Sequence, residues 1–257
     1  MGITTEVTND TIRFSTLKIK PTTFCFPKPS HTVTEVLLMV SALITGQTIL
    51  ENSSLEPEID DLLIMLNSMG AKIHRDPANP KTIIIDGVNS LSGTSHQVIA
   101  DRNETVTFAC AALATKGSIN ILNTDPKIVA TFLKTIQKMG AKIFSGKDEI
   151  TVSWNKPLKA IDIETGPEPL FMTDWQAIFS VLLTQTIGVS SIIERVYPNR
   201  FQHISNLEKM GAKAKYFNPK VKNPENFYEF NPQSDQPQYF HGVKIYGPVK
   251  LKPADFK

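Results

Sequence analysis

The phrase LNSMGAKI at residues 66–73 recurs as IQKMGAKI at 136–143 and as LEKMGAKA at 207–214. The Met-Gly-Ala-Lys cores begin at Met69, Met139 and Met210, at a nearly constant spacing. Such a period over most of a chain indicates duplicated structural units. In each copy we expect the Met to end an amphipathic helix and the Gly to take the left-handed conformation that terminates it. The Ala-Lys pair then leads into a strand.

Whole units repeat, because a second signal precedes each phrase at a similar distance. A hydroxyl or carboxylate residue that can cap a helix is followed three residues later by Glu or Gln, as in a capping box. The three pairs are Thr32 with Glu35, Asp101 with Glu104, and Thr173 with Gln176. With the intervening apolar stripes, each unit is predicted to run β-α-β-α-β-β, which gives an α+β fold. Residues 218–239, rich in Pro, Asn and Gln, are predicted to form a surface insertion.

The composition is that of a soluble globular protein. Of the 257 residues, 41% are hydrophobic and 20% are charged, and the formal net charge is +2. This charge gives no reason to expect a nucleic-acid or membrane partner, although a local basic pocket for phosphate is compatible with it. The apolar run Val36–Ile44 is too short to span a bilayer, and we find no signal sequence. The two cysteines, Cys25 and Cys110, are predicted to be small core residues in a reducing cytoplasm.

Four ordered motifs resemble the UDP-N-acetylglucosamine enolpyruvyl transferases, a family of the EPSP synthase-like superfamily. They are residues 30–73 with EPEIDDL and MGAKI, DRNET at 101–105, FMTDWQ at 171–176, and NRFQH at 199–203 followed by MGA. The resemblance implies an inside-out α/β barrel, or α/β prism, in two pseudo-threefold domains with substrates between them. Residues 1–100 would be the remainder of the first domain with one repeat. Residues 101–257 would be part of the second, with two repeats and the insertion.

The resemblance also implies a reaction and its site. The enolpyruvyl group of phosphoenolpyruvate moves to the 3′-hydroxyl of UDP-N-acetylglucosamine, a step of peptidoglycan precursor synthesis, and phosphate is released without metal or organic cofactor. Asp174 matches the general base, a role open to a carboxylate within hydrogen-bond reach of the hydroxyl. The alternative is an ordinary acid in the first turn of a helix, favoured by the helix dipole. Thr173 is expected to cap this helix, contact substrate, or both.

Other matched positions are expected to bind substrate. Lys28 and Ser30 precede a helix N-terminus, where free N–H groups attract a diphosphate. Arg200 offers a guanidinium fork for phosphate or carboxylate. The remaining matches are Val196, Asp101, Arg102 and Asp255. Three of these positions have a plainer alternative: Val196 as a strand residue of the core, Asp101 as a helix cap, and Lys28 as a solvated lysine.

The resemblance covers only part of the family pattern. The mobile loop with the reactive Cys, several anion-binding arginines and the last repeat fall outside it, so we expect little activity from this chain alone and self-association through an incomplete domain. A binding-only relative that keeps the nucleotide-sugar face is the alternative. An RNA 3′-phosphate cyclase-like protein is disfavoured by the weak net charge and the lack of a histidine nucleophile motif.

Overall fold

The computed structural model describes residues 1–16 and 18–255. Contacts divide the chain into two compact units, unit 1 with residues Met1–Val98 and unit 2 from Ile99 onward. Each unit has a hydrophobic core of its own. Within the described residues, every helix is too short or too polar to cross a bilayer.

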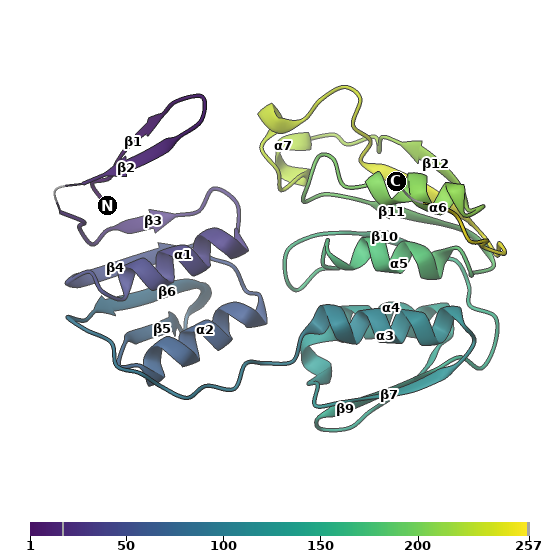
Figure 1. The fold of residues 1–257 in the computed structure, drawn as a ribbon, viewed down its shortest axis with the longest axis horizontal. Helices are drawn as coiled ribbons and strands as arrows, with labels where there is room; N and C mark the ends of the chain where they lie inside the picture. The colour runs from purple at the N-terminus through teal and green to yellow at the C-terminus, as the bar shows by residue number, and fades with distance from the viewer. Residues whose placement is uncertain (17, 256–257) are drawn as a thin grey trace. The chain divides into compact units, whose positions relative to one another are not determined.

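Unit 1 contains an N-terminal hairpin and one complete β-α-β-α-β-β repeat (Figure 1). The sheet of this repeat has the order β3-β4-β6-β5, in which β3 and β4 are parallel and the other neighbours antiparallel. Helices α1 and α2 contact each other. The elements are β1 (Thr4–Val7), β2 (Ile12–Ser15), β3 (Thr23–Cys25), α1 (His31–Ser41), β4 (Gly46–Glu51), α2 (Pro57–Ser68), β5 (Lys72–Asp76) and β6 (Asn79–Gly87).

Helix α1 buries less of its apolar surface than its sequence suggests. Leu38 is fully buried together with Leu50 and Ile59. The stripe that begins at Val33 and Val36 is largely on the outside, however, and its exposed members retain 37–52% of their accessible surface. Those members are Val33, Val36, Val40 and Leu43, with Met39 beside them. Unit 1 therefore presents an apolar helix surface, which we call the α1 face.

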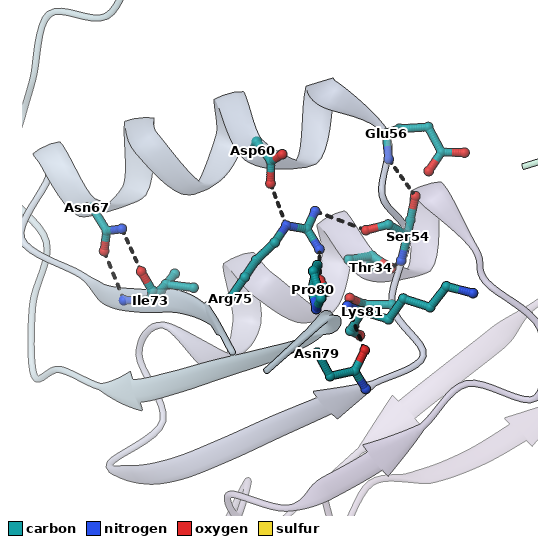
Figure 2. Close-up of polar contacts among 11 residues, drawn as sticks. Thr34, Ser54, Glu56, Asp60, Asn67, Ile73, Arg75, Asn79, Pro80 and Lys81 are labelled. Carbon is teal, nitrogen blue, oxygen red and sulfur yellow. Dashed lines mark hydrogen bonds and ion pairs between the residues drawn. The ribbon is translucent and has the colours of Figure 1, made fainter. Parts of the chain in front are cut away.

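The helix-ending role of the repeated phrase is confirmed. Gly70, Gly140 and Gly211 have φ angles of 103°, 109° and 98°, which lie in the region that favours glycine. In the first copy, the side chain of Asn67 also forms two hydrogen bonds with the backbone of the strand that follows (Figure 2). Its Nδ2 donates to the carbonyl of Ile73 at 2.7 Å, and its Oδ1 accepts from the Ile73 N–H at 2.9 Å.

A second set of polar contacts fastens β5 to its surroundings in unit 1 (Figure 2). The guanidinium of Arg75 donates to Asp60 Oδ1 at 2.6 Å, to the Pro80 carbonyl at 2.8 Å and to the Ser54 carbonyl at 3.0 Å. The Ser54 N–H donates in turn to the hydroxyl of Thr34 on α1 at 3.3 Å. One side chain thus joins strand β5 to α2, to the start of β6 and to the loop before α2.

Unit 2 contains two further repeats (Figure 1). The first has the three-stranded sheet β7-β9-β8, and residues 88–100, which precede its first helix, contain no strand. The second has the order β10-β11-β13-β12, with the same strand directions as in unit 1. The elements of unit 2 are α3 (Arg102–Ala114), β7 (Ser118–Leu122), η1 (Pro126–Val129), α4 (Ala130–Met139), β8 (Lys142–Ser145), β9 (Glu149–Ser153), β10 (Asp162–Glu164), α5 (Trp175–Leu183), β11 (Gly188–Ile193), α6 (Gln202–Lys209), β12 (Lys213–Phe217), α7 (Pro224–Phe227), η2 (Pro232–Ser234) and β13 (Gly242–Gly247).

The two repeats of unit 2 share one core. Helices α3 and α5, the first helices of their repeats, pack against each other. Aromatic rings fill the space beside them, and Phe132 lies edge-on to Trp175 with ring centroids 6.1 Å apart. The α+β fold of repeated units is thereby confirmed.

The segment between β12 and β13 is the one predicted as an insertion. It carries the short helices α7 and η2, and most of its side chains are exposed or half-buried. Tyr228 and Phe230 are buried, however, and their rings stack with centroids 4.8 Å apart. His241 lies against both rings, and its Nε2 is 3.1 Å from Asp235 Oδ2. The segment is thus anchored at its base by aromatic packing.

Two local predictions need correction. The N-cap of α1 is Ser30, whose Oγ accepts from the Val33 N–H, and Thr32 lies inside the helix. Cys25 is exposed on β3, whereas Cys110 is buried as expected. Burial raises the pKa of the Cys110 thiol far above its usual value, which keeps it an unreactive core residue.

Candidate functional site

The candidate site in unit 2 lies where the start of α5 meets the connection from β11 to α6. Asp174 precedes the first residue of α5, and Arg200 lies two residues before the first residue of α6. The carboxylate of Asp174 and the guanidinium of Arg200 form an ion pair, with 42% and 35% of their side-chain surface exposed. A carboxylate and a guanidinium are therefore held together at a surface that a ligand can reach.

Arg200 is held by neighbours at both ends. Its guanidinium carbon lies 4.7 Å from the centroid of the Tyr197 ring. Its backbone carbonyl accepts a hydrogen bond of 2.8 Å from Nε2 of Gln176, which is fully buried on α5. Gln176 was expected to complete a capping box, but it instead joins α5 to the connection that carries Arg200.

A buried carboxylate contacts both of the segments that carry this pair. Glu194 directly follows β11 and is only 1% exposed. It accepts from the Thr173 hydroxyl at 2.9 Å and from the N–H groups of Val196 and Tyr197 at 2.8 and 3.1 Å. Burial raises the pKa of Glu194, and these hydrogen bonds act in the opposite direction. Thr173 is therefore not the helix cap; Asp174 occupies the N-cap position without a capping hydrogen bond from its side chain.

His203 lies on α6 just after Arg200. Its Nε2 is 3.1 Å from the hydroxyl of Ser180 on α5. Burial lowers the pKa of His203 to about 4, and the positive charge of Arg200 contributes in the same direction. The imidazole is therefore neutral near pH 7, and it is a hydrogen-bonding group of the packed interior rather than a second cation.

Two predicted residues at the start of α3 lie in different environments. Asp101 is exposed and caps the helix, with its Oδ1 accepting from the Asn103 and Glu104 N–H groups at 2.7 and 3.4 Å. Arg102 is buried, donates to Glu168 Oε2 at 2.9 Å, and lies 5.8 Å from the centroid of the Trp175 ring. Because Trp175 follows Asp174 directly, Arg102 supports the start of α5 from the inside.

The structure brings together four of the nine predicted residues: Thr173, Asp174, Val196 and Arg200. Lys28 and Ser30 belong to unit 1, where Lys28 is half-buried ahead of α1 and Ser30 caps that helix. Asp255 is exposed near the C-terminus, and the two residues that follow it lie outside the described part of the chain.

Sequence reasoning missed Glu194 and the role of Tyr197. The available signal was an acidic residue directly after an apolar strand and a few residues before NRF. Throughout residues 1–16 and 18–255, there is no group of three His, Cys, Asp or Glu side chains arranged to hold a metal ion.

The chain is similar to known proteins in sequence and in fold. Residues 1–238 match the family model of EPSP synthase (3-phosphoshikimate 1-carboxyvinyltransferase). The UDP-N-acetylglucosamine 1-carboxyvinyltransferase of Prochlorococcus marinus (strain MIT 9312) is 46% identical over 187 residues, which are 73% of this chain and 40% of that protein. The enzyme of the same name from Rhizobium etli (strain ATCC 51251) is 41% identical over 191 residues, 74% of this chain and 44% of that protein.

A solved structure supports the fold. The enolpyruvyl transferase NikO from Streptomyces tendae superposes with a TM-score of 0.75 at 22% identity, over 96% of this chain and 56% of that one. The chain spans less than half the length of the two curated relatives just described. The match over residues 1–238, together with the shared fold, shows that the chain belongs to the EPSP synthase family of enolpyruvyl transferases.

Proposed function

We propose that this chain carries part of the active site of a UDP-N-acetylglucosamine 1-carboxyvinyltransferase. The enzyme would transfer the enolpyruvyl group of phosphoenolpyruvate to the sugar 3′-hydroxyl and release phosphate, in the cytoplasm, for peptidoglycan synthesis. The observation that carries the proposal is the exposed Asp174–Arg200 pair, whose two segments are joined by the buried Glu194. The relatives of that name, which are 40–46% identical, support it.

In this proposal Asp174 and Arg200 have complementary roles. Asp174 accepts the proton of the sugar hydroxyl as its oxygen attacks the enolpyruvyl carbon. Arg200 forms the ion pair that positions Asp174 and supplies positive charge for an anionic group of phosphoenolpyruvate. Thr173 and Val196 both donate hydrogen bonds to Glu194, and in this proposal they line the substrate site beside Asp174 and Arg200.

The remaining predicted residues have supporting roles in the proposal. Lys28 and Ser30 would contact the diphosphate of the nucleotide at the start of α1, where the helix dipole favours an anion. Arg102 would act by positioning Trp175, because it is buried. Asp101 and Asp255, both exposed, are proposed substrate contacts.

Calorimetry with UDP-N-acetylglucosamine tests the binding half of the proposal. Wild-type chain should bind, and Arg200→Met should weaken binding about tenfold, because Asp174, the proposed partner of the sugar hydroxyl, loses the ion pair that positions it. Asp148→Asn, on the exposed turn between β8 and β9, is the matched control and should bind like the wild type. A folded wild-type chain that does not bind the nucleotide sugar would refute the proposal.

A phosphate-release assay with both substrates tests the catalytic half. We expect release by this chain alone to stay near background, because it covers only 40–44% of the length of its relatives. If release is measurable, Asp174→Asn should abolish it, whereas Asp148→Asn should not. Ordinary turnover by the wild-type chain would contradict the expectation of low activity, and turnover unchanged in Asp174→Asn would contradict the role of Asp174.

We further propose that the chain associates with a second copy of itself through the α1 face. Its apolar residues are 37–52% exposed. In unit 2, the first helices of two repeats, α3 and α5, pack against each other. Two copies of α1 can bury their apolar surfaces in the same manner, and hydrophobic burial supplies the driving force.

A further inference from the structure

Glu194 differs from the other acidic residues of unit 2 because it combines near-complete burial with hydrogen bonds to the two segments of the site, and it also bonds the side chain of Thr165 after β10. Its Oε2 accepts from the hydroxyl of Thr173, which lies before α5. Its Oε1 accepts from two consecutive N–H groups, those of Val196 and Tyr197, in the connection that follows β11. Each carboxylate oxygen therefore holds one of the two segments that form the site.

These two segments carry the two members of the exposed ion pair. Thr173 is the residue directly before Asp174. Tyr197 contributes the ring over which the guanidinium of Arg200 lies, at 4.7 Å from the centroid. If either segment moved relative to Glu194, the relative positions of Asp174 and Arg200 would change.

The neighbouring arginine is committed to other partners. Arg195 is 3.4 Å from Glu164 and 3.9 Å from Glu229, and it donates to the Phe227 carbonyl at 2.9 Å. Its backbone N–H donates to the Thr165 hydroxyl at 2.9 Å. The side chains of consecutive residues thus serve different purposes. Arg195 contacts the base of the insertion and the edge strand β10, and Glu194 contacts the site.

We propose that Glu194 is a positioning residue that sets the geometry of the Asp174–Arg200 pair by clamping the segments on which the two stand. The benefit for catalysis rests on the function proposed above, whereas the clamp itself does not. A carboxylate suits this task because both of its oxygens accept hydrogen bonds, whereas a glutamine offers one acceptor and one donor group. Glu194→Gln must therefore give up or invert the contact with one segment.

Nuclear magnetic resonance of the guanidinium and backbone tests the clamp directly. In Glu194→Gln, the Nε–H signal of Arg200 and the amide signals of Val196 and Tyr197 should shift, and exchange of these two amides should accelerate about tenfold or more. Glu164→Gln, which alters a carboxylate near Arg195 only, is the matched control. Its Arg200 signal should remain at the wild-type position. An unchanged Arg200 signal in Glu194→Gln would overturn the proposal.

The Thr173 side of the clamp provides a second test that keeps the buried carboxylate. Thr173→Val has a similar shape but lacks the donor, and it should shift the Arg200 signal in the same way. Thr173→Ser keeps the hydroxyl and should restore the wild-type signal. If both variants give the same Arg200 signal, the hydrogen bond does not transmit position and the proposal is wrong.

Calorimetry then separates this proposal from the function it serves. If the wild type binds UDP-N-acetylglucosamine, Glu194→Gln should bind it about tenfold more weakly, and Glu164→Gln within about twofold of wild type. Binding to Glu194→Gln at wild-type affinity would overturn the link to the site. If the wild type does not bind while Glu194→Gln moves the Arg200 signal, the proposed function fails and the clamp stands.

Discussion

Gly87 illustrates how one residue without a side chain permits a turn of the repeat. It closes β6 opposite Gly46, and a Cβ atom there would lie 1.7 Å from the carbonyl oxygen of Ile44. Gly247 occupies the same place in the last repeat, with Thr186 O at 2.4 Å from the added atom. Contacts this close force the backbone to move, so the position admits only glycine.

We expect Gly87→Ala to reduce the free energy of unfolding of unit 1 by about 3 to 5 kcal/mol, through strain at a crowded backbone. Hydrogen exchange of the amides in β4 and β6 measures this loss. Gly93→Ala is the matched control, because an added Cβ there meets no atom within 4 Å. Equal effects of the two substitutions would show that crowding at Gly87 is relieved at little cost.

His203 predicts a pH dependence of stability. Its pKa is lowered from 6.5 to about 4 in the folded chain, chiefly by burial. Between these values the unfolded chain binds more protons than the folded one, so the free energy of unfolding falls as the pH is lowered from 6.5 towards 4. In His203→Gln this loss should be smaller. His74→Gln, at an exposed position on β5, should keep the wild-type slope. Urea unfolding at several pH values compares them, and parallel slopes in all three proteins would refute the assignment.

Local signals in the sequence were sufficient for some residues of the site and not for others. The glycine of each Met-Gly-Ala-Lys phrase was predictable because its conformation depends on the helix that it ends. The Thr173 cap was predicted wrongly, because its hydroxyl instead bonds Glu194, which lies on another element. Whether a threonine caps its own helix or serves a distant carboxylate depends on tertiary packing, which the neighbouring residues do not encode.

Strand β5 likewise has one feature that the sequence predicted and one that it did not. Its place after the phrase was predictable, but its attachment through Arg75 was not, since the three partners of the guanidinium come from three separate segments. An apolar stripe was predicted between the Thr32 capping signal and the first phrase, and α1 carries one. Its exposure was not foreseeable, because a periodic pattern predicts an apolar face without stating what covers it.

Arg75→Lys should lower the free energy of unfolding of unit 1 by about 1 to 2 kcal/mol. A lysine cannot reproduce the planar fork that reaches Asp60 and the carbonyls of Ser54 and Pro80 together. Asp60→Asn should cost less than about 1 kcal/mol, because Asp60 is 54% exposed and its ion pair is screened by solvent. Hydrogen exchange in β5 and β6 compares the two. A larger loss in Asp60→Asn would show that the ion pair, and not the carbonyl contacts, holds the strand.

For the whole molecule, the α1 face predicts a concentration-dependent dimer. Light scattering should give a mass approaching twice 28.5 kDa as concentration rises. Introducing polar side chains by Val36→Gln and Val40→Gln together should shift the distribution towards monomer, because less apolar surface is buried on association. Ile64→Gln, at a position of α2 that is 60% exposed, is the matched control. A wild-type monomer at all concentrations would contradict self-association.

The segment between β12 and β13 occupies the tip of a hairpin that every repeat contains. In unit 1 the same tip is the short turn between Asp76 and Asn79, and in the first repeat of unit 2 it lies between Ser145 and Glu149. The last repeat keeps its strand order despite the added length. The hairpin tip therefore tolerates insertions. Foreign sequence such as an epitope or a reporter can be inserted there while the sheet keeps its strand order.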